Sequence, residues 1–333
     1  MANGAGVLIV GEVAGRELAG ITGELLGVGR KLANARGEEL LAVFLGSGIG
    51  ATAAGAFAQG ADKVYVVDNS LLASYQPESY AAAMERVCAE LTPGILLMGA
   101  TYMGRDLAPK LACRLKTGLA TDCVALNIDP QTRGMLATRA AYGAKAMAEV
   151  DCGTVRPAMA SVKTKSQEPL EPDSSRRGAV VPIAVQLNAA LAKTQVVNRV
   201  TVEVKGIRLE DARIVVGGGR GLGSIANWKS LEALAADLKG AVGSTRGACD
   251  EGYCEMATQL GITAKSIAPE LYIAVGISGA SQHMGGVSFS KHIVCINKDA
   301  ESPVFKLSQY GVVGKWEDVL PAFHRKVKEL LAG

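Results

Sequence analysis

The sequence has few of the residues from which most catalytic and metal centres are built. Its 333 residues include three histidines and seven cysteines, and no two cysteines form a C-x-x-C pair. The missing pairs argue against a zinc ribbon or an iron–sulfur module. No Ser/His/Asp order, paired-carboxylate motif or metal-ligand spacing indicates hydrolytic chemistry. An odd number of scattered thiols is typical of a protein from a reducing compartment.

An excess of charge of one sign and long apolar runs are also missing. The 35 lysines and arginines nearly balance the 32 aspartates and glutamates, and they are scattered along the chain. This is far from the basic stripe of a nucleic-acid-binding protein. No apolar stretch reaches the ~18 residues that a membrane helix needs, and the first residues lack the charged start of a secretory signal. We therefore expect a cytoplasmic prokaryotic protein, with a processed organellar protein as the alternative, that neither binds nucleic acid nor inserts into a membrane.

The sequence is rich in glycine and in short apolar runs. It contains 40 glycines and is 49% hydrophobic, which is typical of α/β proteins with many tight strand–helix turns. Strand-like runs alternate with helical patterns over residues 7–115, and further strands are expected over 136–163. A polar loop over 164–178 and strand-like patterns over 180–185 and 194–204 complete the first part. We predict two α/β domains, 1–206 and 207–333, each with a mainly parallel sheet, the second doubly wound.

One glycine turn in the first domain looks like a dinucleotide-binding turn. Gly46-Ser-Gly-Ile-Gly50 ends a strand and is expected to open a helix that runs to about Gln59. It follows the second strand rather than the first, and no acidic residue is expected at the usual distance at a strand end. We predict that this turn is structural.

The second domain contains two turns that suit an anionic ligand. An apolar strand over 271–275 ends in Gly276-Ile-Ser-Gly279, where glycine allows a sharp turn and close approach of a ligand. A helix that begins near Ala280 would point its free N–H groups into this turn, and Gln282 and His283 follow directly. A strand over 214–216 runs into Gly217-Gly-Gly-Arg-Gly-Leu222, where Arg220 offers a forked donor for phosphate. The alternative at both turns is a tight connection without a ligand.

The stretch from Ala268 to Gly286, APELYIAVGISGASQHMGG, closely resembles the C-terminal signature of the electron-transfer flavoprotein α subunit. Similar matches occur at Gly217–Gly221, Ala241–Asp250, Gln259–Lys265 and Val304–Gly314. The resemblance is looser over residues 1–205. It implies a C-terminal domain that holds FAD and an N-terminal domain that packs against a β subunit in a heterodimer.

The resemblance assigns roles to several polar residues. Arg246 corresponds to an arginine beside the flavin ring, where a fixed positive charge stabilises reduced, anionic flavin. Thr245 keeps a hydroxyl for FAD, and Thr263 matches the partner near flavin N5. His283 matches a histidine near flavin O2, where an imidazolium would offset charge and a neutral ring would only donate a hydrogen bond. Asn297 and Asp299 would reach the ribose or adenine.

The sequence departs from the family pattern at three places. Ile262 replaces a glutamine, Ala264 replaces a glycine, and Lys315-Trp316 replaces an Asp-Leu pair whose aspartate contacts FAD. The resemblance implies no metal site. It implies that Arg246, Thr263 and His283 tune the flavin. The cofactor-binding residues that it implies are Arg220, Thr245, Arg246, Leu260, Gly261, Ile262, Thr263, Gly276, Ile277, Ser278, Gly279, Ala280, Ser281, Gln282, His283, Asn297, Asp299, Lys315 and Trp316.

The function implied is that of an electron carrier rather than a classical enzyme. The α subunit would take electrons from dehydrogenases of the acyl-CoA type, as in fatty acid β-oxidation, and pass them to a downstream quinone reductase or ferredoxin. One alternative is an electron-bifurcating flavoprotein that oxidises NADH with a second FAD in the β subunit. Alternatives of other classes are an NAD-linked dehydrogenase or transhydrogenase-like subunit and a nucleotide-binding regulator without redox chemistry.

Overall fold

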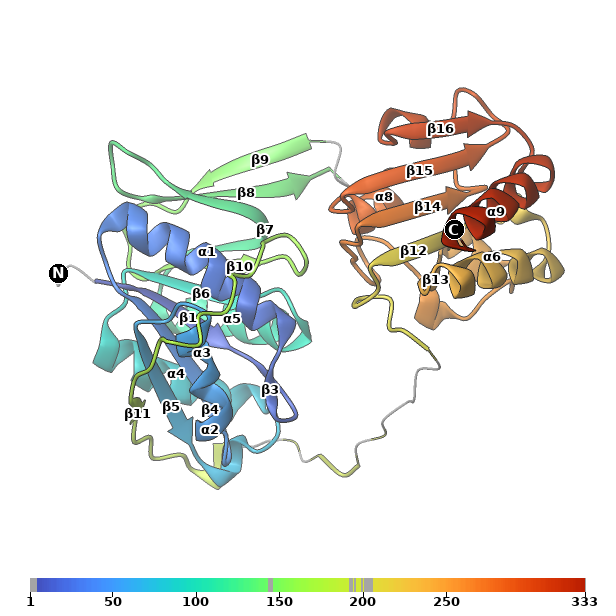
Figure 1. The fold of residues 1–333 in the computed structure, drawn as a ribbon. Helices are drawn as coiled ribbons and strands as arrows, with labels where there is room; N and C mark the ends of the chain where they lie inside the picture. The colour runs from blue at the N-terminus through green and yellow to red at the C-terminus, as the bar shows by residue number, and fades with distance from the viewer. Residues whose placement is uncertain are drawn as a thin grey trace. The chain divides into compact units, whose positions relative to one another are not determined.

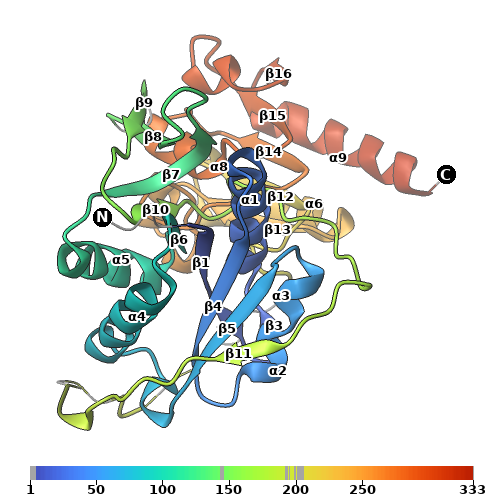
Figure 2. The ribbon, with the colours of Figure 1, turned by 90° about the vertical axis from the view of Figure 1, so that its left-hand side faces the viewer.

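The computed structural model describes residues 5–142, 146–191, 194, 196–198, 200 and 206–332. These residues fall into two compact units, one made of residues up to 141 and from 147 to 200, and the other of residues 142, 146 and those from 206. Each unit is built on its own sheet (Figures 1 and 2). Among the described residues, no helix combines the length and the apolar character needed to cross a membrane. Most of the strand-like stretch predicted over 194–204 lies outside the described residues.

The first unit is built on a nine-stranded mixed sheet. The strand order is β11-β5-β4-β1-β6-β10-β7-β8-β9. Pairing is parallel from β11 to β7 and antiparallel between β7 and β8, so the sheet is mainly parallel, as predicted. The strands are β1 (Val7–Gly11), β4 (Leu40–Gly46), β5 (Lys63–Asp68), β6 (Ile95–Gly99), β7 (Leu119–Ile128), β8 (Met135–Ala141), β9 (Ala146–Asp151), β10 (Ala158–Val162) and β11 (Val180–Pro182).

Helices cover both faces of this sheet because its central strands are apolar on both sides. Val7 and Ile9 of β1 pack in one core with α1 (Gly20–Arg36). Leu8 and Val10 pack in the core on the opposite face, together with residues of α4 (Pro77–Leu91) and α5 (Tyr102–Leu115). The other helices are α2 (Gly50–Ala53) and α3 (Gly55–Ala58), and a two-residue hairpin joins β2 (Val13–Ala14) to β3 (Glu17–Leu18).

The glycine turn after β4 differs from its prediction in two respects. The single helix predicted up to Gln59 is broken into α2 and α3. In addition, the expectation that no acidic residue stands at the usual distance at a strand end is wrong, since Asp68 ends β5, about 20 residues after the glycine turn. Its carboxylate accepts the N–H of Gly48 at 3.0 and 3.2 Å. The Asp68 carboxylate therefore takes up the Gly48 N–H, which is a hydrogen-bond donor that a bound phosphate would need.

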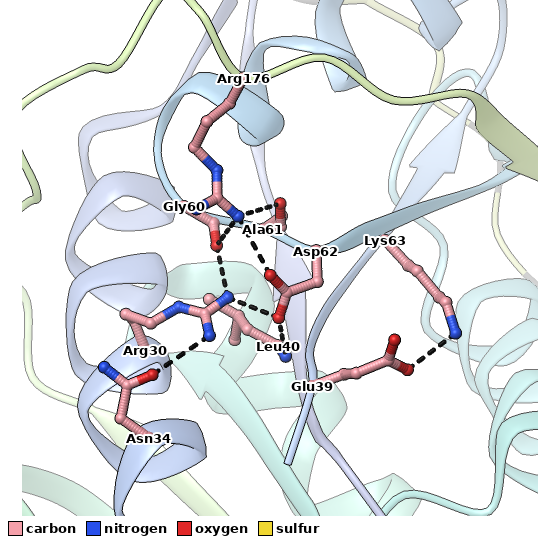
Figure 3. Close-up of polar contacts among 9 residues, drawn as sticks. All are labelled: Arg30, Asn34, Glu39, Leu40, Gly60, Ala61, Asp62, Lys63 and Arg176. Atoms are coloured by element: carbon pink, nitrogen blue, oxygen red, sulfur yellow. Dashed lines mark hydrogen bonds and ion pairs between the residues drawn. The ribbon is translucent and has the colours of Figure 1, made fainter. Parts of the chain in front are cut away.

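The predicted loop over 164–178 contains no helix or strand and is fastened to the sheet by Asp62 (Figure 3). The Asp62 carboxylate accepts from Arg30 at 2.6 Å, from Arg176 of the loop at 3.0 Å and from the Leu40 N–H at 2.8 Å. Partial burial opposes ionisation, but the Arg30 hydrogen bond and charge outweigh it and hold the pKa of Asp62 below its usual value. Glu24 fastens the start of the same loop by accepting the Lys165 and Ser166 N–H groups.

The second unit is built on a five-stranded parallel sheet in the order β13-β12-β14-β15-β16. The chain runs outward from β12 to β13 and then returns to place β14 on the other side of β12. This reversal makes a topological switch point, at which α/β proteins bind ligands. The strands are β12 (Ile214–Gly218), β13 (Ala241–Ser244), β14 (Leu271–Val275), β15 (His292–Asn297) and β16 (Tyr310–Val313).

Helices lie on both faces of this second sheet, which confirms the doubly wound fold (Figure 1). Trp228 of α6 and Leu320 of α9 share one core with Val216 and Ile273. Met284 of α8 belongs to the core on the opposite face. The helices are α6 (Ile225–Asp237), α7 (Arg246–Asp250), α8 (Ser281–Val287) and α9 (Trp316–Ala332).

Candidate functional site

A cavity of about 1060 Å³ lies in the second unit at the carboxyl ends of β12, β14 and β15. Its position is the switch point between β12 and β14, where adjacent loops turn to opposite faces of the sheet. The volume is large for a small-molecule site. The cavity is lined by Gly219, Arg220, Gly221, Thr245, Arg246, Gly247, Gln259, Leu260, Gly261, Thr263, Gly276, Ile277, Ser278, Ala280, Gln282, His283, Ile296, Asn297, Lys298, Asp299, Ser302, Lys315, Trp316 and Glu317.

One wall of the cavity is made of bare backbone from two glycine turns. The Gly221 N–H donates to the Gly276 carbonyl at 3.1 Å, so the turns after β12 and β14 touch. A Cβ on Gly219 would lie 2.1 Å from the Gly276 oxygen, and Gly276 itself has a φ of +62°. Side chains cannot enter this wall, which lets a ligand approach the main chain closely.

The turn after β14 is held in place from behind. The Ser278 carbonyl accepts the Val304 N–H at 3.1 Å and the Ser302 hydroxyl at 2.9 Å. Ala280 is the N-cap of α8, close to the predicted helix start. The first N–H groups of a helix have no partner within it, and Ala280 and Gln282 line the cavity beside them.

Thr245 and Arg246 reach the cavity from the start of α7. Thr245 Oγ1 caps this helix by accepting the Ala248 N–H at 3.3 Å, so its hydroxyl hydrogen stays available to a ligand. The Arg246 side chain is 76% exposed, and its Nε lies 3.5 Å from Asp250. Within this chain the guanidinium is therefore surrounded by water, which screens its charge.

The cavity lining is more basic than acidic. Arg220, Arg246, Lys298 and Lys315 oppose two carboxylates, Asp299 and Glu317. Arginine and lysine around bare N–H groups favour a ligand with negative charge, such as a diphosphate.

His283 is buried and neutral, with 6% of its surface exposed. Its Nδ1 lies 3.2 Å from the Leu260 carbonyl, which can only accept, so Nδ1 carries the hydrogen. Nε2 then accepts from the Tyr272 hydroxyl at 2.8 Å. Burial lowers the pKa of His283 to about 4, and the Leu260 hydrogen bond offsets this only in part.

These contacts correct the predicted role of His283. The imidazolium form is not the form present at neutral pH, because the pKa lies well below 7. Both ring nitrogens already have partners inside the protein, so this arrangement leaves no N–H for flavin O2. The ring still lines the cavity, and it fixes the Leu260 backbone beside it.

The side chain of Asn297 also makes its hydrogen bonds within the protein rather than leaving them for a ligand. Its Nδ2 donates to the Ile277 carbonyl at 2.8 Å and to Ser302 Oγ at 3.1 Å, while Oδ1 accepts the Asp299 N–H at 2.9 Å. The side chain thus ties the turn after β14 to the loop after β15. The Asp299 carboxylate accepts the Glu301 N–H at 3.0 Å and keeps further acceptor capacity.

Most predicted site residues line the cavity, and the two substituted positions Lys315 and Trp316 are among them. Three predicted residues, all within the described ranges, do not line it: Ile262, Gly279 and Ser281. The Ile262 N–H donates to the Gln282 carbonyl at 2.8 Å, so this residue links two lining segments through its backbone. Gly279, with a φ of +84°, packs against Val304.

Eight lining residues were absent from the predicted set. Most stand inside or next to the motifs that carry the resemblance, and Lys298 lies between two predicted residues. The motifs could therefore have indicated them, whereas Ser302 carries no sequence signal because a loop brings it to the site. The eight are Gly219, Gly221, Gly247, Gln259, Ile296, Lys298, Ser302 and Glu317.

A doubly wound sheet with a basic, glycine-walled cavity at its switch point defines an α/β protein that binds a nucleotide cofactor. Two family models match the chain. One describes the electron transfer flavoprotein domain and covers residues 7–188. The other describes the electron transfer flavoprotein FAD-binding domain and covers residues 208–288. The chain belongs to the electron transfer flavoprotein family as an α subunit, and its cofactor is FAD.

Relatives match over nearly the full chain. The electron transfer flavoprotein α subunit of Thermoanaerobacterium thermosaccharolyticum is 39% identical over 324 residues, which cover 97% of this chain and 98% of that protein. The α subunit of Bacillus subtilis is 38% identical with the same coverage. A protein of Anaerotignum propionicum named acryloyl-CoA reductase electron transfer subunit beta is 34% identical over 92% of this chain and 91% of its own length. Membership among α subunits implies a β subunit as partner.

Proposed function

We propose that this chain holds FAD in the cavity of its second unit and works with its β subunit as an electron carrier in the cytoplasm. Electrons would come from a dehydrogenase of the acyl-CoA type and leave to a quinone reductase or ferredoxin. The observation that carries the proposal is the basic, glycine-walled cavity at the switch point. The name of the Anaerotignum propionicum relative supports an acyl-CoA-type partner.

The residues of the cavity fit FAD as follows. When bound, FAD accepts and donates electrons, and the protein supplies binding and electrostatics. Arg220 and the backbone of the two glycine turns would hold the diphosphate. Thr245, Arg246 and Thr263 would face the flavin ring, and Asp299 with Lys315 would face the adenosine end. The boundary between the N-terminal domain, 1–206, and the FAD domain, 207–333, remains part of this proposal.

The test is to produce the chain together with its β subunit and extract the cofactor from the purified complex. We expect a yellow complex in which the α chain accounts for one FAD, and which an acyl-CoA dehydrogenase reduces when its substrate is present. A colourless complex that binds nicotinamide nucleotide would contradict the proposal and favour the NAD-linked dehydrogenase.

The bifurcating alternative makes a different prediction for the same sample. Two FAD molecules per heterodimer and rapid reduction by NADH would support it. One FAD together with AMP, and no reduction by NADH, would support the simple carrier.

A further inference from the structure

Two free cysteines lie next to each other at the helix that begins with a cavity-lining residue. Cys249 Sγ and Cys254 Sγ are 3.6 Å apart. Cys249 belongs to α7, which begins with the cavity-lining Arg246. Cys249 is 8% exposed and Cys254 is half-buried. Neither is among the residues that line the cavity, so the pair is separate from the surface that receives the cofactor.

The backbone brings the two thiols together through the turn that ends α7. The Gly252 N–H donates to the Cys249 carbonyl at 2.9 Å, and the Tyr253 N–H donates to the Ala248 carbonyl at 3.0 Å. Gly252 has a φ of +74°. These are the two bonds and the left-handed glycine of a Schellman motif, which reverses the chain at a helix end. The reversal returns Cys254 to Cys249.

We propose that Cys249 and Cys254 form a reversible intramolecular disulfide that closes the turn between two segments that contribute residues to the cavity lining, Thr245–Gly247 and Gln259–Thr263. The sulfurs need to approach from 3.6 Å to roughly 2.05 Å. The turn that carries Cys254 lies at the chain surface, where Glu251 and Gly252 are exposed, so this movement does not require the sheet to shift.

The reaction is thiol–disulfide exchange with a small disulfide such as oxidised glutathione. The more accessible Cys254 attacks one sulfur of the small disulfide as a thiolate and releases one small thiol. Cys249 then displaces the second small thiol from the mixed disulfide. The two protein thiols lose two electrons and two protons, and the small disulfide gains both. Burial raises the pKa of the Cys249 thiol, which favours Cys254 as the first nucleophile.

Oxidation also removes a hydrogen-bond donor next to the cavity. The Thr258 hydroxyl hydrogen goes to the Glu255 carbonyl at 2.7 Å, so the Ser244 hydroxyl donates to Thr258 at 2.9 Å. The Cys249 S–H is then the donor toward Ser244 Oγ at 3.0 Å or the Glu255 carbonyl at 3.6 Å. A disulfide has no S–H. Ser244 directly precedes Thr245, and Thr258 directly precedes Gln259, so both cavity-lining segments adjoin the change.

The direct test measures the disulfide itself in the complex with the β subunit. The complex is treated with oxidised glutathione, denatured, alkylated and digested for mass spectrometry. We expect a peptide pair linked through Cys249 and Cys254, and loss of the link after dithiothreitol. In C249S we expect glutathione trapped on Cys254, and in C113S, which removes an exposed thiol, we expect the link to form as in the parent protein. Alkylation of both thiols after treatment would overturn the proposal.

A second measurement tests the effect on the site, and this part rests on FAD lying in the cavity. The rate of FAD release is followed by flavin fluorescence for the oxidised and the reduced complex. Because a closed loop restricts the segment that joins the two lining stretches, we expect slower release from the oxidised form, by up to about tenfold. In C254S, glutathione treatment should leave the rate unchanged. A linked peptide with an unaltered release rate would overturn the coupling but leave the disulfide and the FAD site standing.

Discussion

Tyr272 and His283 are joined by a buried hydrogen bond of 2.8 Å between the tyrosine hydroxyl and Nε2. Tyr272 belongs to the central strand β14 and is fully buried, while His283 lies in the first turn of α8. The bond therefore couples the sheet to the helix that follows the cavity-lining turn. His283 extends the link to the Leu260 carbonyl of the adjacent segment that also lines the cavity. This one neutral ring therefore joins a buried strand residue to two segments that line the cavity.

We predict that the second unit loses stability when the pH falls below about 6.5. The unfolded histidine has a pKa near 6.5, whereas burial lowers that of folded His283 to about 4. Between these values the unfolded chain binds more protons, so the free energy of unfolding falls as the pH drops. The full loss is roughly 3 kcal/mol, reached near pH 4. Urea unfolding of the second unit, followed by Trp228 and Trp316 fluorescence at several pH values, measures it.

The matched control for this prediction is His292, which is exposed at the start of β15. H292Q should keep the pH dependence of the parent protein, whereas H283Q should flatten it between pH 4 and 6.5. H283Q should also be less stable at pH 7, by about 1–3 kcal/mol, because a buried partner of Tyr272 or Leu260 is disturbed. An H283Q variant with the parent slope would show that another group titrates.

The role of His283 illustrates what the sequence cannot predict. The motif places a histidine next to a ligand-binding turn, and the structure puts it at the cavity. However, its two partners stand 11 and 23 residues away in the sequence. The protonation of a buried ring depends on such long-range contacts and on burial. Neither the long-range contacts nor the burial leaves a pattern in the nearby sequence.

The fold was more predictable than the site because apolar runs and glycines mark strands and turns directly. The strand predicted over 271–275 is β14, and the loop over 164–178 is a loop. The pattern indicates no strand over Ala241–Ser244, since Ala-Val-Gly-Ser has little intrinsic preference for one. Pairing with β12 nevertheless makes this segment β13. The resemblance located the cavity motifs, but loops such as the one that carries Ser302 join the site only through tertiary packing.

A methyl group on Gly219 should remove FAD from the complex. In G219A the new Cβ would lie 2.1 Å from the Gly276 carbonyl oxygen, so the two glycine turns must separate. We expect less than a tenth of the parent FAD content and a loss of about 1–3 kcal/mol in the free energy of unfolding. Absorbance of the purified complex gives the FAD content. G118A in the first unit is the control, because its Cβ would have nothing within 4 Å; full FAD content in G219A would show that the close approach of the two glycine turns is not needed for FAD binding.

Removal of the Asp62 carboxylate should release the loop over 164–178. D62A leaves Arg30, Arg176 and the Leu40 N–H without their shared acceptor (Figure 3). We expect a loss of about 1–3 kcal/mol and faster proteolysis within the loop. E39A is the control, because the Glu39–Lys63 pair is about half exposed on both sides and such pairs contribute less than ~1 kcal/mol. Equal proteolysis of D62A and the parent protein would show that Glu24 and the loop's contacts with backbone carbonyls hold the loop without Asp62.

Arg246 should affect the flavin potential far more than protein stability. Its side chain is 76% exposed and its pairing with Asp250 is long at 3.5 Å, so R246A should change the free energy of unfolding by less than ~0.5 kcal/mol. A guanidinium at the cavity favours reduced, anionic flavin. We expect R246A to lower the midpoint potential by about 30–60 mV, the equivalent of up to roughly tenfold in a one-electron equilibrium.

Spectroelectrochemical titration of the complex measures this shift, and two variants define its origin. R246K keeps the charge and should restore most of the potential, although it lacks the planar fork of arginine. R213A removes an exposed arginine that pairs with Glu270 at the opposite end of the sheet's strands, and it should leave the potential unchanged. If R246A and R213A gave the same potential, the Arg246 charge would be too well screened by water to act on the cofactor, as its exposure in this chain alone would allow.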